Sequence, residues 1–436
     1  MLQPQQPTVE VIPSTPSTIT LSEDAELAGQ DEVVQIKSDS EVNERFPTKV
    51  SFRERLRHFT WAWYTSTMST GGLALLIGTQ PYKFSGLSQI GLAVYIFDLV
   101  LFTLICCLMA TRFFLHGGML DSIRHPREGF FFPTFWLSIA TIISGMYRCF
   151  GSNGALELYA NGGRPPLGFI TLLEVLFWMY CFCTLLVAIL QYSYVFNSVP
   201  YPLQTMMPSW ILPAFPVMLS GTIASVVSEA HPGRTTIPMV MAGVTFQGLG
   251  FSISVLMYSH YVGRLMESGI PASEHRPGMF ICVGPPAFTA LALIGMAQGL
   301  PDGVNLGKTF AFSDMPSEHV FDNTDKHTLE ILAIACGVFL WALSFWFFCL
   351  AFVSVIKCPP KAFHLNWWAM VFPNIGFTIA TITLGKSLHS PGVMAVGSAM
   401  SVLIVCMWIF VAASHIRAVF ITKAIMWPGK DEDVIE

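Results

Sequence analysis

Charged residues are scarce in this sequence. Asp, Glu, Lys and Arg account for 12% of the 436 residues, whereas they make up about 25% of a typical soluble domain. Hydrophobic residues account for 53%, and the mean hydropathy is +0.56. This composition excludes an ordinary soluble domain and predicts a polytopic protein whose surroundings are a lipid bilayer. Nothing in the sequence suggests a surface for nucleic acid, and no such partner is predicted.

The sequence also lacks the spacings that metal sites, disulfide frameworks and membrane enzymes need. The ten cysteines lie mostly inside apolar runs, and no CxxC or Cys/His ligand spacing is present. There is no HExxH or GxGD motif and no Ser/His pair at matching depths. His58, His364 and His389 lie at span ends, where interface histidines are ordinary. We therefore predict no enzymatic activity, no metal and no cofactor.

Residues 1–50 contain no apolar segment, so no cleavable signal is predicted. They are rich in Ser, Thr, Pro, Glu and Gln, which favours a disordered cytoplasmic tail. We expect the membrane domain to cover residues 51–427 and a short acidic cytoplasmic tail to cover residues 428–436.

Ten apolar segments are long enough to cross a bilayer, which requires about 20 residues. Lys and Arg flanking these segments are about twice as frequent on one side as on the other, which places both termini in the cytoplasm. The predicted spans are approximately 58–79, 88–115, 132–150, 166–197, 208–228, 236–265, 279–299, 328–356, 364–385 and 392–422.

Helix breakers alternate along these spans. Each odd-numbered span has a Gly or Pro interruption near mid-depth, while most even-numbered spans are longer and lack proline. Non-helical backbone is tolerated in a membrane only inside protein or beside a watery cavity. The pattern therefore predicts five helical hairpins around a central pore, with odd-numbered helices inside and even-numbered helices facing lipid. The predicted break residues are Gly71, Gly72, Gly145, Pro216, Gly221, Gly284, Pro285, Pro286, Pro373 and Gly376. The alternative is that Gly and Pro are simply commoner in membrane helices.

Neutral polar residues cluster near the breaks, and cations lie at span ends. Hydroxyls and free amides flanked by positive charge suit an anion. The candidate anion contacts are Lys386, Arg276, Arg148, Thr67, Ser69, Thr70, Ser220 and Asn374. Two alternatives stay open, because a membrane Ser or Thr also bonds to its own helix and Lys386 could extend to the interface as an ordinary end residue.

Two acids, Asp98 and Glu174, lie inside apolar spans. Intramembrane carboxyl groups often relay protons, so both are candidates for a proton-linked role. Both occur on predicted outer helices, where a structural pairing between hairpins explains them equally well.

Several long stretches resemble the fungal malic acid (C4-dicarboxylate) permeases of the tellurite-resistance/dicarboxylate transporter family, to which plant slow anion channels also belong. The stretches are "LRHFTWAWYTSTMSTGGLALLIG" at 56–78, "FQGLGF" at 246–251, "RPGMFICVGPPAF" at 276–288, "WWAMVFPNIGF" at 367–377 and "PGKDED" at 428–433. The resemblance implies ten helices in five hairpins and a phenylalanine that closes the pore. By its position in "WWAMVFP" that residue is Phe372, for which packing against lipid or span eight is the alternative.

The resemblance further implies transport of malate, succinate and fumarate across the plasma membrane, and it suggests a homo-oligomer, a trimer. Linkage to protons is left open. The alternative function is efflux or channel-like passage of sulfite or another small inorganic anion on the same fold.

Overall fold

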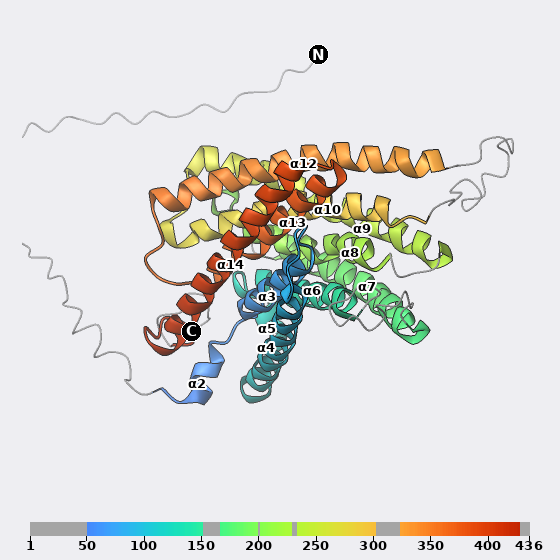
Figure 1. The fold of residues 1–436 in the computed structure, drawn as a ribbon. Coiled ribbons are helices and arrows are strands. Elements are labelled where there is room, and N and C mark those ends of the chain that lie inside the picture. Colours follow the sequence, from blue (N-terminus) through green and yellow to red (C-terminus); the bar gives the residue numbers. More distant parts are fainter. Residues whose placement is uncertain (1–49, 151–165, 199–200, 229–232, 302–322, 428–436) are drawn as a thin grey trace, which may run out of the picture. The chain divides into compact units, whose positions relative to one another are not determined.

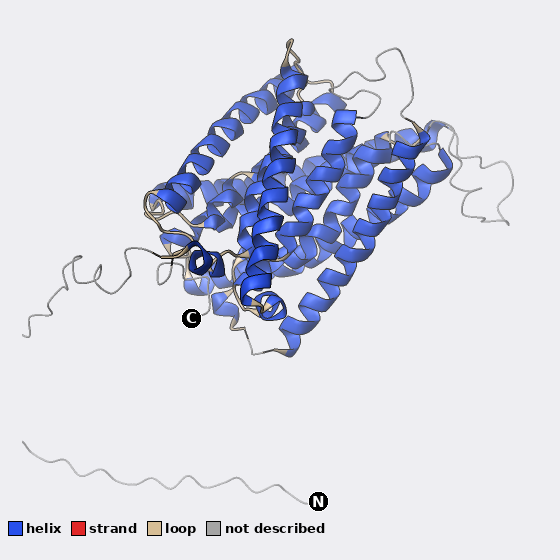
Figure 2. Cartoon of the chain, turned by 90° about the horizontal axis from the view of Figure 1, so that it is seen from below, coloured by secondary structure: helices blue, strands red, loops and turns tan. Residues whose placement is uncertain are grey.

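The computed structural model describes residues 50–150, 166–198, 201–228, 233–301 and 323–427. Both predicted tails therefore lie outside the described residues, apart from Val50. Within the described ranges the secondary structure consists of helices and contains no strand (Figure 2). The prediction of an all-α membrane protein is confirmed.

The helices fall into two groups that alternate along the chain. The five inner helices are α3 (Tyr64–Gly78), α6 (Pro133–Phe150), α8 (Phe215–Val227), α10 (Gly284–Gln298) and α13 (Phe372–Ser387). The five outer helices are α4 (Leu87–His116), α7 (Leu167–Asn197), α9 (Gly233–Ser268), α12 (Asn323–Lys357) and α14 (Pro391–Phe420). Two short helices, α2 (Phe52–Arg57) and α5 (Met119–Arg124), lie before α3 and after α4.

Burial separates the two groups. In the most apolar stretch of each outer helix, 17% to 33% of the residues are buried, against 61% to 94% in the spans that contain α6, α8, α10 and α13. Twelve of the 15 residues of α3 are buried as well. The outer helices are also longer, at 30 to 36 residues, which suits tilted helices at a lipid boundary. The predicted division into inner and outer helices agrees with this burial.

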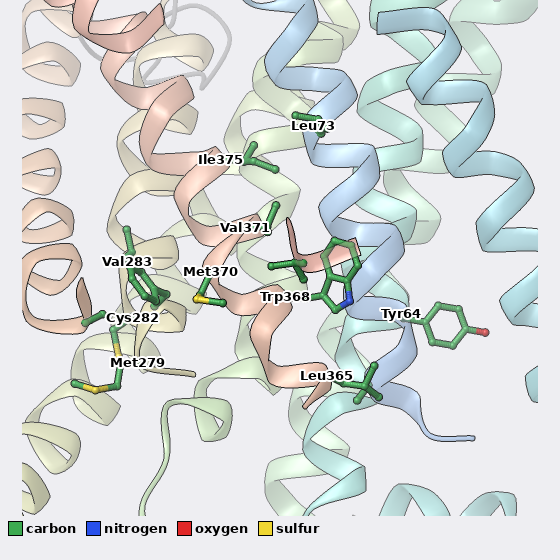
Figure 3. Packing of buried hydrophobic residues seen from close by; sticks show 14 of the residues in the cluster. Tyr64, Leu73, Met279, Cys282, Val283, Leu365, Trp368, Met370, Val371 and Ile375 are labelled. Carbon is green, nitrogen blue, oxygen red and sulfur yellow. The ribbon is translucent and has the colours of Figure 1, made fainter. Parts of the chain in front are cut away.

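Contacts between helices close the inner group into a ring. In the order α3, α6, α8, α10 and α13, each helix contacts the next, and α13 contacts α3 (Figure 1). Each inner helix also contacts the outer helix that follows it in the chain. Figure 3 shows part of the packing, where Val371 and Ile375 lie on the side of Leu73 of α3 and Met370 lies on the side of Val283.

A 3-10 segment precedes the α-helix in every inner span. These segments are η1 (Trp61–Trp63), η2 (Glu128–Phe131), η4 (Pro208–Ala214), η6 (Ser273–Val283) and η7 (Leu365–Met370). Pro133, Pro216, Pro285 and Pro373 lie in the first turn of the α-helices that follow. Proline is tolerated there because the first amides of a helix have no acceptor within it. A further short segment, η3 (Leu203–Thr205), lies between α7 and η4.

These junctions correct the sequence prediction of the breaks. Pro216, Gly284, Pro285, Pro286 and Pro373 lie where a 3-10 segment becomes α-helix, as a break there requires. The remaining predicted break residues lie inside continuous α-helix: Gly71, Gly72, Gly145, Gly221 and Gly376. A glycine costs an α-helix only about 1 kcal/mol, so these helices continue through it. At these positions glycine instead leaves room for a neighbouring side chain.

Nine helical segments of the described chain are long and apolar enough to cross a membrane. The predicted first span is absent from this set, because α3 has only 15 residues and is rich in Ser, Thr and Gly. The count of ten crossings therefore stays a prediction at α3, which nevertheless occupies one place in the inner ring.

Candidate functional site

Three phenylalanine rings meet inside the inner ring of helices. Phe372, the first residue of α13, is 1% exposed and stacks on Phe288 of α10 with centroids 5.1 Å apart. Phe215, the first residue of α8, lies 6.1 Å from Phe372 and 5.8 Å from Phe288. We refer to these three rings as the plug.

Each ring of the plug lies against a glycine of another inner helix. A Cβ at Gly72 of α3 would lie 3.2 Å from the ring of Phe372. A Cβ at Gly376 of α13 would lie 2.5 Å from Phe288, and one at Gly284 of α10 would lie 2.6 Å from Phe215. At Gly376 and Gly284 the separations leave no room for a Cβ, and at Gly72 the Phe372 ring would have to shift by a few tenths of an ångström, so the three glycines provide the space that the rings fill.

Phe372 borders two small cavities. One, of about 10 Å³, is lined by Thr65 and Thr134 among mostly apolar residues. The other, of about 20 Å³, is lined by Thr141 and Thr222. A cavity needs roughly 10–15 Å³ to hold one water molecule, so neither can hold a hydrated anion. Because Phe372 belongs to both walls, the plug separates the two cavities in this closed arrangement.

The candidate hydroxyls of α3 are engaged with their own helix. Thr67 donates to the carbonyl of Tyr64, Ser69 to that of Thr65 and Thr70 to that of Ser66, at 2.7 to 2.9 Å. None of the three lines either small cavity. Their arrangement matches the alternative that the sequence left open for membrane hydroxyls.

Ser220 and Asn374 are buried, and the Ser220 Oγ and Asn374 Oδ1 atoms have no hydrogen-bond partner in the described part of the chain. Neither residue lines a cavity beside the plug. Thr222 does line the larger one, and its Oγ1 is also buried without a described partner. On α8 the hydroxyl residue that lines this cavity is therefore Thr222, two positions beyond the predicted Ser220.

Two of the three candidate cations come together at the C-terminal ends of the inner helices. Lys386 Nζ donates to the carbonyl of Thr79 at 2.7 Å, and the charges of Arg148 and Lys83 act on it. Arg148 Nε is buried without a described partner. We call Lys83, Arg148 and Lys386 the C-terminal cation cluster.

Arg276 lies at the opposite end of the inner helices. It belongs to η6, which contacts η7 at the start of the span that ends with Lys386. Its guanidinium donates to the carbonyls of Pro271 at 3.0 Å and Ser354 at 2.8 Å. The structure thus uses Arg276 to join η6 to α12 and separates it from the C-terminal cation cluster.

The two intramembrane acids have different surroundings. Asp98 of α4 is fully buried, and neither carboxyl oxygen has a described hydrogen-bond partner. A Cβ at Gly71 would lie 2.7 Å from Asp98 Oδ2 and 2.4 Å from Thr141 Oγ1, so Asp98 lies at the junction of α3 and α6. Glu174 is half-buried on the outer helix α7 and borders neither small cavity.

Sequence reasoning missed two rings of the plug. The dipeptide Phe-Pro begins three inner helices, at 132–133, 215–216 and 372–373. This recurrence could have identified Phe215 as an equivalent of Phe372. Phe288 has no comparable signal, because it lies one turn into α10 after "GPPA".

Comparisons with known proteins agree with this architecture. Residues 58–416 match the family described as SLAC1, voltage-dependent anion channel. The chain is 35% identical over 389 residues to the malic acid transport protein of Schizosaccharomyces pombe, covering 88% of this chain and 83% of that protein. It is 21% identical over 361 residues to the sulfite efflux pump SSU1 of Trichophyton rubrum, covering 82% and 90% of the two chains. Since the family match spans most of the sequence, this chain belongs to the SLAC1 family of voltage-dependent anion channels.

Proposed function

We propose that this multi-pass membrane protein transports C4-dicarboxylates, namely malate, succinate and fumarate, along the axis of the inner ring. The chain belongs to a family of channels and transporters and is not an enzyme. The observation that carries the substrate class is the 35% identity to a malic acid transport protein over most of both chains. In this proposal the plug closes the path, and the C-terminal cation cluster attracts anions to one end of it.

Phe372 is the moving part of the closure in this proposal. An apolar constriction blocks hydrated ions because it cannot replace their water. Rotation of the Phe372 ring away from Phe288 would join the two small cavities that it now separates. Thr222, whose Oγ1 has no partner in the described part of the chain, would then offer its hydroxyl to the passing anion.

Sulfite or another small inorganic anion is the second candidate substrate, favoured by the 21% identity to a sulfite efflux pump. Uptake of labelled malate into reconstituted vesicles tests the choice. We expect unlabelled succinate to compete with malate and sulfite or nitrate to have little effect. Absence of malate uptake, together with uptake of labelled sulfite into the same vesicles, would favour the alternative.

We also propose that transport is linked to protons through Asp98 and not through Glu174. Asp98 is the buried acid that lies against two inner helices, beside Gly71 and Thr141. The test is malate uptake with the pH gradient and the membrane voltage set independently. Uptake that follows the pH gradient at clamped voltage is expected, and the Asp98→Asn variant should lose that dependence. Uptake that follows voltage alone would mean a channel-like path without proton linkage.

The proposed location is the plasma membrane, with both termini in the cytoplasm. The excess of Lys and Arg on one side of the spans supports this orientation. A homotrimer is proposed by family resemblance alone, and analytical ultracentrifugation of the detergent-solubilised protein would test it.

A further inference from the structure

A cavity of about 440 Å³ lies at the N-terminal ends of the inner helices. Residues of all five 3-10 segments contribute to its wall: Ala62, Phe131, Ser209, His275 and Leu365. We call this cavity the vestibule. Its volume falls in the range of small-molecule binding sites, roughly 300–1,000 Å³, whereas the cavities beside the plug hold about one water each.

The wall of the vestibule carries several hydrogen-bond donors and one fixed positive charge, that of Arg127. Arg127, His275 and His364 line it, and none of its lining residues is Asp or Glu. Two acids lie beside the wall. Glu274 is acted on by both histidines and accepts a hydrogen bond from Ser273 at 2.7 Å, and Glu128, which follows Arg127 in the chain, is paired with Arg112. An arginine fork matches a carboxylate, and an imidazole donates at least one N–H in either protonation state.

The vestibule leads to the plug. Phe131, Ile281 and Asn366 line both the vestibule and the smaller cavity, whose wall also contains Phe372. A Cβ at Gly278 would lie 2.5 Å from Asn366 Nδ2, so glycine at 278 leaves room for this donor at the shared wall. An amide donor therefore stands where an anion would pass from the vestibule toward the plug.

From these observations we infer that the vestibule is a C4-dicarboxylate binding site on one side of the plug, with Arg127, His275 and His364 donating to the carboxylates. The inference rests on the proposed transport function and adds a binding site to it. A dianion that enters a narrow apolar path loses much of its hydration at once. A donor-lined cavity ahead of the plug replaces part of that hydration and raises the local anion concentration.

Calorimetric titration of malate into the purified full-length protein in detergent tests the site. We expect the wild type to bind malate and Arg127→Gln to bind it about tenfold more weakly, the loss expected for one charge-assisted hydrogen bond. Ser209→Asp should also weaken binding, because it places a like charge in the wall. Arg57→Gln is the matched control, since Arg57 is exposed and pairs with Glu54 away from the vestibule.

Malate uptake by the same proteins in vesicles separates this inference from the proposed function. If the wild type carries malate but Arg127→Gln and Ser209→Asp bind it with wild-type affinity, the vestibule site is wrong and the transport proposal stands. The vestibule site is equally wrong if the wild type binds no malate at concentrations that saturate uptake. If the wild type neither carries nor binds malate, both proposals are wrong. If Arg127→Gln fails to fold, the malate affinities of Ser209→Asp and His364→Gln test the vestibule site in its place.

Discussion

Two phenylalanines of α13 show how one helix serves two environments. Phe372 is 1% exposed and packs on Phe288 within the inner ring. Phe377 is 2% exposed but lies 5.4 Å from Trp341 and 5.8 Å from Phe348 on the outer helix α12. The two residues share a type, a helix and a degree of burial, and they differ in whether they face the path.

That difference predicts that alanine changes transport at one position and not at the other. Phe372→Ala should raise malate uptake several-fold, because it removes the ring that separates the two cavities beside the plug. Initial rates of labelled malate uptake into reconstituted vesicles measure the effect.

Phe377→Ala is the control for this variant. Truncating a buried phenylalanine costs about 3–5 kcal/mol of stability, so both variants should show a comparable fall in melting temperature. Only Phe372→Ala should raise uptake. An equal rise in both would indicate general loosening of the ring and would contradict the plug.

The C-terminal cation cluster should raise the rate at which anions enter from that end of the inner ring. Lys386→Gln combined with Arg148→Gln should lower malate entry from that side by roughly tenfold at low salt and by less at high salt, because screening already weakens steering. The ionic-strength dependence of the initial uptake rate checks this. Lys357 is an exposed cation at the end of α12. The Lys357→Gln control should leave the initial uptake rate and its ionic-strength dependence unchanged. If malate uptake depends on salt identically in the wild type, the double variant and Lys357→Gln, the cluster does not attract anions.

Single residues mark the limit of what the sequence could predict. Lys386 and Arg148 were identifiable because each cation lies at the end of a predicted inner span, near neutral polar groups that suit an anion. Arg276 satisfied the same criterion, yet its guanidinium bonds to two backbone carbonyls, one of them on another helix. Likewise, the hydroxyls of Thr67 and Thr222 look equivalent in sequence. The two side chains differ in where they point: Thr67 donates to a carbonyl of its own helix, whereas Thr222 lines a cavity beside the plug.

At the scale of elements, a buried polar network fixes the start of α6. Arg112 of α4 donates to both carboxylate oxygens of Glu128 in η2 and to the carbonyl of Phe59. Ser122 of α5 donates to Glu128 at 2.7 Å, and the indole of Trp61 donates to Ser122 at 2.9 Å. One carboxylate thus joins four elements at the N-terminal end of the ring.

Removing the charge of Glu128 should therefore destabilise the whole helical body. Glu128→Gln leaves Arg112 buried without its counter-charge, for which we expect a loss of about 3 kcal/mol. The exposed pair of Arg57 and Glu54, 3.8 Å apart, provides the comparison, and Glu54→Gln should cost less than about 1 kcal/mol. Thermal unfolding in detergent measures both. Equal melting temperatures for the two variants would mean that the network contributes no more than a surface pair.

The alternation of elements was predictable, but the position of each break was only partly so. Proline removes a donor and marks the junction at Pro216 and Pro373, whereas Pro238 lies inside the continuous helix α9. Glycine is ambiguous, because it permits both a turn and a close approach between helices. In the spans of α3 and α6 the junctions fall at Tyr64 and Pro133, well before the predicted Gly71 and Gly145.

At the scale of the whole molecule, the direction of the chain gives the two ends of the ring different chemistry. Every inner span begins at the vestibule and ends at the other side, so all five run in one direction. Loop residues at the two ends should then meet different solutions. Tyr82, in the loop after α3, is 55% exposed, and Cys358, directly after α12, is also exposed.

Labelling these loops tests the proposed orientation. A membrane-impermeant maleimide should modify a Tyr82→Cys, Cys358→Ser variant in intact cells. In the wild type it should reach Cys358 only after permeabilisation, because that loop is expected in the cytoplasm. Modification of Cys358 in intact cells would invert the orientation.

The seating of each plug ring on a glycine has a consequence for how this chain can vary. Each ring and its glycine belong to different helical hairpins, in the pairs Phe215 with Gly284, Phe288 with Gly376, and Phe372 with Gly72. An added methyl group at one member of a pair has room only if the other member shrinks. Gly376→Ala should therefore damage the protein alone and be rescued by Phe288→Leu, as a second-site suppressor. The ring and the glycine of each pair are far apart in the sequence, yet a substitution at one requires a matching substitution at the other.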